Sequence, residues 1–128
     1  MIKGVEKPDE YVILSAHFDS WDGGQGTTDN GTGSIVMLEA MRILKKLYPN
    51  PKRTIMVGHW GSEEQGLNGS RAFVEDYPNI VDNIQALFNQ DNGTGRVVDL
   101  SGSGFLHSYD YLSRWLCLLY TSDAADDL

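Results

Sequence analysis

Three short apolar segments alternate with helix-like segments along most of the chain, and this alternation limits the possible folds more than any other feature. Residues 11–16 (YVILSA), 54–60 (TIMVGHW) and 84–88 (IQALF) are apolar and strand-like, as is typical of buried strands. Residues 34–48 have helical apolar spacing, and a shorter helix is expected at 70–76. We therefore predict an α/β fold with three layers, α/β/α, and a mainly parallel (mixed) sheet.

The longer helix has a regular apolar stripe along one face. Its last turn carries lysines, which suit the negative end of the helix dipole, and prolines follow directly. The residues of the stripe are Ile35, Leu38, Met41, Leu44 and Leu47.

Each predicted strand leads into a loop with carboxylates, and the first strand also supplies a histidine. His17 and Asp19 follow the first strand, Glu63 and Glu64 follow the second, and Asp91 follows the third. Ligands bind at the carboxyl ends of strands in open α/β sheets, so these loops should meet there. Carboxylates gathered at one edge repel one another unless a cation binds, and carboxylates with an imidazole suit zinc or a similar divalent ion.

The pentapeptide DNGTG occurs twice, at 29–33 and at 91–95. The two copies have no matching flanks, so a repeat architecture is not supported. Each copy instead begins with an aspartate at the start of a glycine-rich turn, after a different strand. We interpret Asp29 and Asp91 as two parts of one site.

The three loops, taken in order, resemble a known enzyme family. HFDSWDGGQGTTDNGTG, GSEEQGLNGS and FNQDNGTG are similar to the co-catalytic di-zinc exopeptidases of metallopeptidase family twenty-eight, within it most of all to the carboxypeptidase Q subgroup. The resemblance covers most of residues 11–106 and implies a zinc-exopeptidase-like fold, incomplete at the C-terminus. The ordered set is a specific signal, although each motif alone would be weak.

The resemblance also implies a role for each loop residue. His17 and Asp91 would share one zinc, Asp29 would bridge two zincs, and Glu64 would be a further ligand. Glu63 would be the general base, and Asp19 would support the catalytic site from behind His17. The implied cofactors are two zinc ions per complete domain, and the implied substrate is a peptide or dipeptide.

One ligand of the family has no counterpart in this chain. The family supplies its last histidine far downstream, and neither His59 nor His107 matches that position. We therefore expect residues 1–116 to be the N-terminal part of a zinc peptidase catalytic domain, with weak metal retention and little activity alone. Residues 117–128 (CLLYTSDAADDL) resemble a translated sequencing adapter, so we expect them to be a non-native segment.

Other functions are compatible with the same residues. A binding module of this fold without metals and a single-zinc enzyme similar to glutaminyl cyclase are the alternatives, and aminopeptidase or carboxypeptidase activity stays open, as does the oligomeric state. A net charge of −8 without a basic patch disfavours nucleic acid, and no apolar run reaches the roughly 18 residues of a membrane span. The resemblance implies a secreted or cell-envelope (periplasmic) protein.

Overall fold

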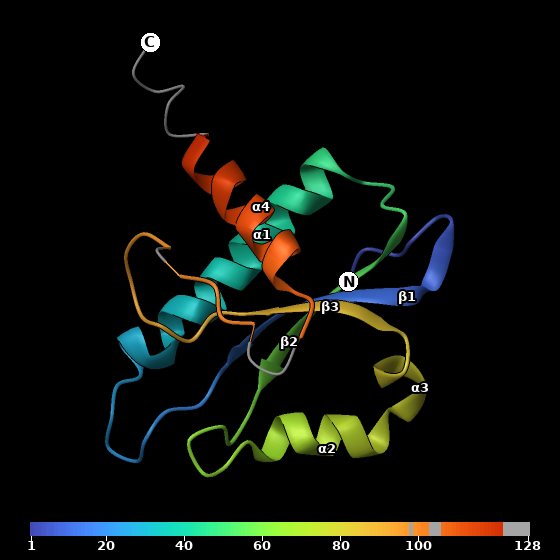
Figure 1. Cartoon of the computed structure of the whole chain (residues 1–128). Coiled ribbons are helices and arrows are strands. Elements are labelled where there is room, and N and C mark those ends of the chain that lie inside the picture. The colour runs from blue at the N-terminus through green and yellow to red at the C-terminus, as the bar shows by residue number, and fades with distance from the viewer. Residues whose placement is uncertain (98, 103–105, 122–128) are drawn as a thin grey trace. The chain divides into compact units, whose positions relative to one another are not determined.

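Three parallel strands form the sheet that carries the predicted site. They are β1 (Lys7–His17), β2 (Arg53–Trp60) and β3 (Ile84–Asn89), in the spatial order β2-β1-β3. Residues 13–17 of the central strand β1 are all buried. Because all three strands run the same way, the loops that follow them lie at one edge of the sheet (Figure 1).

The computed structural model describes residues 1–97, 99–102 and 106–121. The chain divides into two compact units, Met1–Thr94 and Gly95–Leu128. The first unit holds the sheet and every predicted site residue. In the second unit, α4 (Tyr109–Thr121) includes residues 117–121 of the segment expected to be non-native, and residues 122–128 lie outside the described part.

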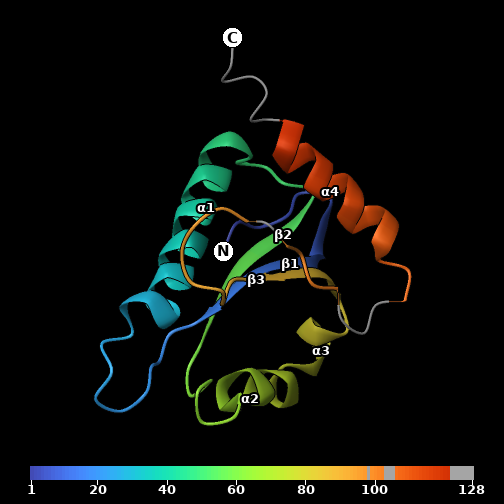
Figure 2. The same cartoon turned by 60° about the vertical axis from the view of Figure 1, so that its left-hand side comes forward.

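Helices cover both faces of the sheet in the first unit. α1 (Gly33–Leu47) lies on one face, while α2 (Asn68–Asp76) and α3 (Pro78–Val81) lie toward the other, as Figures 1 and 2 show. Alternate residues of a strand can contact the helices on the two faces of the sheet, since successive side chains of a strand point to opposite faces. The core cluster of Leu14, Ala16 and Met37 joins β1 to α1, and the rings of Trp60 and Phe73 pack 5.2 Å apart between β2 and α2.

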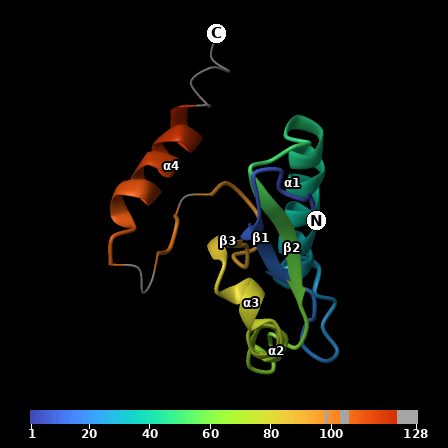
Figure 3. The ribbon, with the colours of Figure 1, turned by 90° about the vertical axis from the view of Figure 1, so that its right-hand side faces the viewer.

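The expected α/β fold is thus confirmed, and Figure 3 shows the sheet nearly edge-on with α1 against it. The antiparallel component of the expected mixed sheet is small. Within the described ranges it is limited to one isolated bridge between Ile2 and Ile55. No helix in the described part of the chain is long and apolar enough to cross a membrane.

Only part of the apolar stripe predicted for α1 packs against the core. Ile35, Leu38 and Leu47 are 68%, 54% and 64% exposed, whereas Met41 and Leu44 pack against the core. The inner stripe is Met37, Ala40, Met41 and Leu44. The start of α1 is attached to the end of β1, because the Ser34 hydroxyl donates a hydrogen bond to the backbone carbonyl of His17, 3.0 Å away.

Two local elements were not expected from the sequence. The loop predicted from 19 to 33 contains a short helical segment, η1 (Thr27–Thr32), which is kinked at Asp29 and Asn30, where the backbone angles are not helical. Pro78 was expected only to close the preceding helix, but it also begins α3. A proline at the first position of a helix costs no hydrogen bond, because that N–H has no partner inside the helix.

Candidate metal centre

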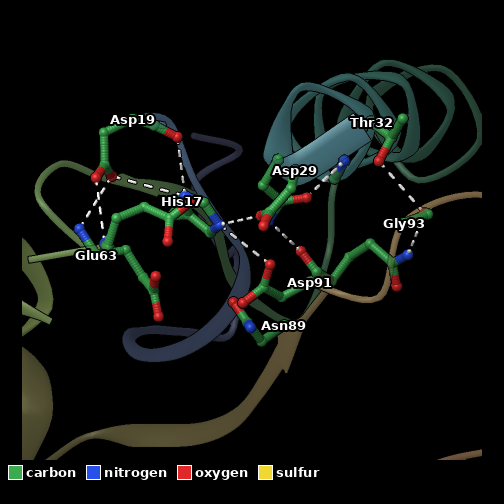
Figure 4. A network of polar contacts seen from close by, with 12 residues as sticks. His17, Asp19, Asp29, Thr32, Glu63, Asn89, Asp91 and Gly93 are labelled. Carbon is green, nitrogen blue, oxygen red and sulfur yellow. Dashed lines mark hydrogen bonds and ion pairs between the residues drawn. The ribbon is translucent and has the colours of Figure 1, made fainter. Parts of the chain in front are cut away.

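The two DNGTG aspartates meet at one buried histidine. His17 is the last residue of β1 and is 2% exposed. Its Nε2 atom lies 3.0 Å from Asp29 Oδ1 and 3.1 Å from Asp91 Oδ1 (Figure 4). One ligand atom from each of the three residues falls within 4.8 Å of the other two. The structure therefore brings together three of the four side chains that were predicted to bind metal.

The hydrogen bond of the other ring nitrogen of His17, Nδ1, determines which nitrogen carries the proton. Nδ1 lies 3.1 Å from the backbone carbonyl oxygen of Asp19, which can only accept a hydrogen bond, so Nδ1 carries the proton. In the neutral imidazole, Nε2 then presents a lone pair to two carboxylate oxygens. Those three electron-rich atoms repel one another unless a proton or a cation lies among them.

The charge balance around His17 agrees with a cation-binding position. Burial alone lowers the pKa of the His17 imidazole, but the carboxylates of Asp91 and Asp29 outweigh burial and raise that pKa above its ordinary value. The two carboxylates therefore favour positive charge at this position. A divalent ion bound by the same three side chains would supply that charge.

Asp19 connects the end of β1 to the loop that follows β2. Its Oδ1 accepts a hydrogen bond from the backbone N–H of Glu63 (3.0 Å), and its Oδ2 accepts one from Glu64 (3.2 Å). Asp19 Oδ1 also lies 3.6 Å from His17 Nδ1. Burial alone raises the pKa of Asp19, yet the two backbone N–H groups hold it below its ordinary value. Asp19 thus holds the His17 ring through its backbone carbonyl and the backbone of both glutamates through its carboxylate.

Replacing Asp19 by asparagine is expected to weaken zinc binding about 10- to 100-fold, as is typical when a residue supporting a metal ligand is changed. Asparagine keeps one acceptor oxygen but turns an N–H₂ group toward the other backbone N–H, and it removes the charge near His17. Asp22→Asn is the matched control, because Asp22 is exposed on the same loop. Zinc titration of both variants of the complete protein measures the effect, and equal affinities would contradict it.

Glu64 lies near the three-residue group without belonging to it. Its Oε1 atom is buried and has no hydrogen-bond partner in the part of the chain that the structure describes. Burial, and next the charge of Asp29, raise the pKa of Glu64 above its ordinary value. A buried carboxylate oxygen without a partner needs an explanation, and an ion that the structure does not contain would supply one. The donor set therefore fits a metal centre.

Glu63 faces a hollow beside His17. The hollow has a volume of about 260 Å³ and contains Glu63, His17 and Asp91 at its polar end. The rest of its wall is mostly apolar and comes from the sheet and α2. These lining residues are Trp60, Leu67, Ser70, Phe73, Val74, Ile84, Leu87 and Asn89.

Two features of the site were missed by sequence reasoning. Asn30, the second residue of the first DNGTG segment, is only 2% exposed. A partly buried chain of hydrogen bonds also runs across the sheet: Trp60 Nε1 donates to Ser15 Oγ (2.7 Å), which donates to Asn89 Oδ1 (2.6 Å). The position of Ser15, a polar residue inside an apolar strand, was a signal that could have indicated this second feature.

Comparisons with known proteins identify the family of the chain. The sequence profile of peptidase family M28 matches residues 1–116. The chain is 40% identical over 93 residues to carboxypeptidase Q of Xenopus laevis, covering 73% of this chain and 20% of that protein. It is 42% identical over 81 residues to aminopeptidase NAALADL1 of Rattus norvegicus, covering 60% and 11%.

A solved structure gives the same result for the fold. The crystal structure of a peptidase M28 precursor from Shewanella amazonensis SB2B superposes with a TM-score of 0.67 at 37% identity, covering 75% of this chain and 22% of that one. The chain thus spans about a fifth or less of the length of these relatives. The resemblance carried by the three acidic loops is confirmed, and the chain belongs to peptidase family M28.

Proposed function

We propose that the protein containing this chain is a di-zinc exopeptidase that hydrolyses a terminal peptide bond of a peptide or dipeptide. The observation that carries this proposal is the convergence of Asp29 and Asp91 on Nε2 of the buried His17. Three electron-rich atoms so close together are unfavourable without a cation. Their mixture of imidazole and carboxylate donors suits zinc.

The ligands divide between two ions as follows. His17 and Asp91 would hold one zinc, Glu64 would bind the other, and Asp29 would bridge them. Asp29 is suited to that position because it contacts His17 Nε2 on one side and acts electrostatically on Glu64 on the other. When bound, zinc ions at such a site lower the pKa of a water molecule and polarise the scissile carbonyl.

Glu63 is the proposed general base. Its carboxylate lines the hollow next to His17, and its backbone is held by Asp19, so it can reach a water molecule near the centre. The carboxylate would take the proton from the water as that water attacks the carbonyl carbon. It would then return the proton to the leaving amine, as general acid–base catalysis requires.

The names of the relatives include a carboxypeptidase and an aminopeptidase. We therefore assign exopeptidase action without choosing the substrate terminus. A location outside the cytoplasm, secreted or in the cell envelope, accompanies this proposal. This chain alone would have little activity, because the last histidine ligand of the family has no counterpart in it.

Metal analysis of the complete protein tests the proposal directly. About two zinc ions per chain, with release of amino acids from an unblocked dipeptide, are the expected results. An N-acetylated and a C-amidated dipeptide of the same sequence would then identify the terminus that is recognised. A metal-free protein would instead support a binding module, and one zinc with pyroglutamate formation would support a cyclase.

A further inference from the structure

The side chain of Asn30 joins the two DNGTG segments to each other. Its Oδ1 accepts a hydrogen bond from the backbone N–H of Gly33 (3.0 Å), and its Nδ2 donates one to the backbone carbonyl of Gln90 (2.8 Å). Asn30 directly follows Asp29, and Gln90 directly precedes Asp91. One buried carboxamide therefore links the backbones next to both aspartates, which are far apart in the sequence.

The surroundings of this side chain leave little room for change. A Cβ atom at Gly33 would collide with Asn30 Oδ1 and with the carbonyl oxygen of Gln90, so the close approach depends on glycine there. A second contact lies beside it, where the Thr32 hydroxyl is 3.3 Å from the Gly93 carbonyl oxygen (Figure 4). The two loops are thus docked against each other as one unit.

The link opposes a repulsion that the site creates. Asp29 and Asp91 both direct an oxygen at His17 Nε2, and two carboxylates this close repel each other when no metal is bound. Both aspartates lie in glycine-rich segments, whose backbone has more conformational freedom than that of other residues. Only a neutral group with a donor and an acceptor satisfies Gly33 and Gln90 together, which is what the carboxamide provides.

We propose that Asn30 is a positioning residue that sets the spacing of the Asp29 and Asp91 carboxylates across His17, and through that spacing sets the affinity of the centre for metal. The proposal rests on the metal centre of the proposed function. It assigns no chemical step to Asn30, which holds the ligands in register before a metal arrives.

Asn30→Asp tests this role in the complete protein with Co²⁺ as the probe. Aspartate keeps an acceptor for the Gly33 N–H but faces the Gln90 carbonyl with a second oxygen, so that link is lost. We expect Co²⁺ affinity to fall about tenfold or more, the range found when support for a metal ligand is removed. The visible absorption spectrum of bound Co²⁺ should also change, because the coordination by Asp91 is altered.

Two further variants make the result interpretable. The serine of Asn30→Ser can still accept a hydrogen bond from the Gly33 N–H, but it is too short to reach Gln90, and it buries no charge. If Asn30→Asp fails to fold, the Co²⁺ affinity of Asn30→Ser should fall instead. Asn83→Asp is the control. Asn83 follows α3 and is exposed, and its side-chain amide donates a hydrogen bond to the backbone carbonyl of Asn79. This control variant should leave Co²⁺ affinity unchanged.

A purely structural role for Asn30 predicts a different result. The unfolding midpoint would then fall, but the folded Asn30 variants, measured well below that midpoint, would bind Co²⁺ with unchanged affinity and spectrum. That outcome would overturn the positioning role and leave the proposed function intact. Failure of the unsubstituted protein to bind Co²⁺ would overturn both.

Discussion

Replacing Asp29 by alanine in the complete protein is expected to abolish the pairing of two zinc ions, whereas Asp91→Ala should mainly weaken one of them. Asp29 lies between two groups: its Oδ1 is 3.0 Å from His17 Nε2, and its charge raises the pKa of Glu64. Asp91 contacts the same nitrogen of His17 at 3.1 Å, and the assignment places it on one ion only.

Zinc content after gel filtration in metal-free buffer measures this difference. Removing a direct ligand should weaken binding by more than the roughly 10- to 100-fold seen for outer-shell changes. Asp29→Ala should therefore leave fewer zinc ions than Asp91→Ala, which should keep about one. Asp22→Ala, an exposed aspartate on the loop after β1, is the control and should keep both. Equal loss of both ions from the Asp29 and Asp91 variants would contradict the bridging assignment.

The architecture could be predicted because its signals are local. A strand with two buried faces is a short run of apolar residues, whereas apolar residues recur every three or four positions in a surface helix. The order of strands and helices therefore follows from the pattern of apolar residues along the chain. The inner face of α1 could not be predicted in the same way. The helix is apolar on more than one side, and the side that packs against the sheet depends on contacts with other elements, among them the hydrogen bond from Ser34 to His17.

The gathering of acidic loops could be predicted for a similar reason. Parallel strands bring their carboxyl ends to one edge, so residues such as His17 and Asp91 were expected to be neighbours. The sequence could not show that both DNGTG segments pack against each other through Asn30. Asparagine in a glycine-rich segment usually indicates a turn, and nothing in the pentapeptide marks the first copy's asparagine as buried.

Replacing Glu63 by glutamine is expected to lower kcat for dipeptide hydrolysis about 10²- to 10⁴-fold, the usual contribution of a general acid–base group. Zinc content and KM should change little. Glutamine has nearly the same shape, and the backbone N–H of residue 63 would still donate to Asp19. The amide cannot accept a proton from the attacking water, so only the chemical step is affected.

Glu64→Gln should have the opposite effect to Glu63→Gln on zinc content. This contrast distinguishes the roles of the two adjacent glutamates. The buried Oε1 of Glu64 has no partner among the described residues, and Asp29 acts on this carboxylate electrostatically. The proposal therefore makes Glu64 a metal ligand, and glutamine there should lower zinc content before it lowers catalysis. Glu75→Gln, exposed on α2, controls for the loss of one charge. Loss of zinc from the Glu63 variant, with zinc kept by an inactive Glu64 variant, would mean that the two roles are exchanged. Steady-state kinetics and metal analysis on the same samples therefore decide which carboxylate moves the proton and which one holds the ion.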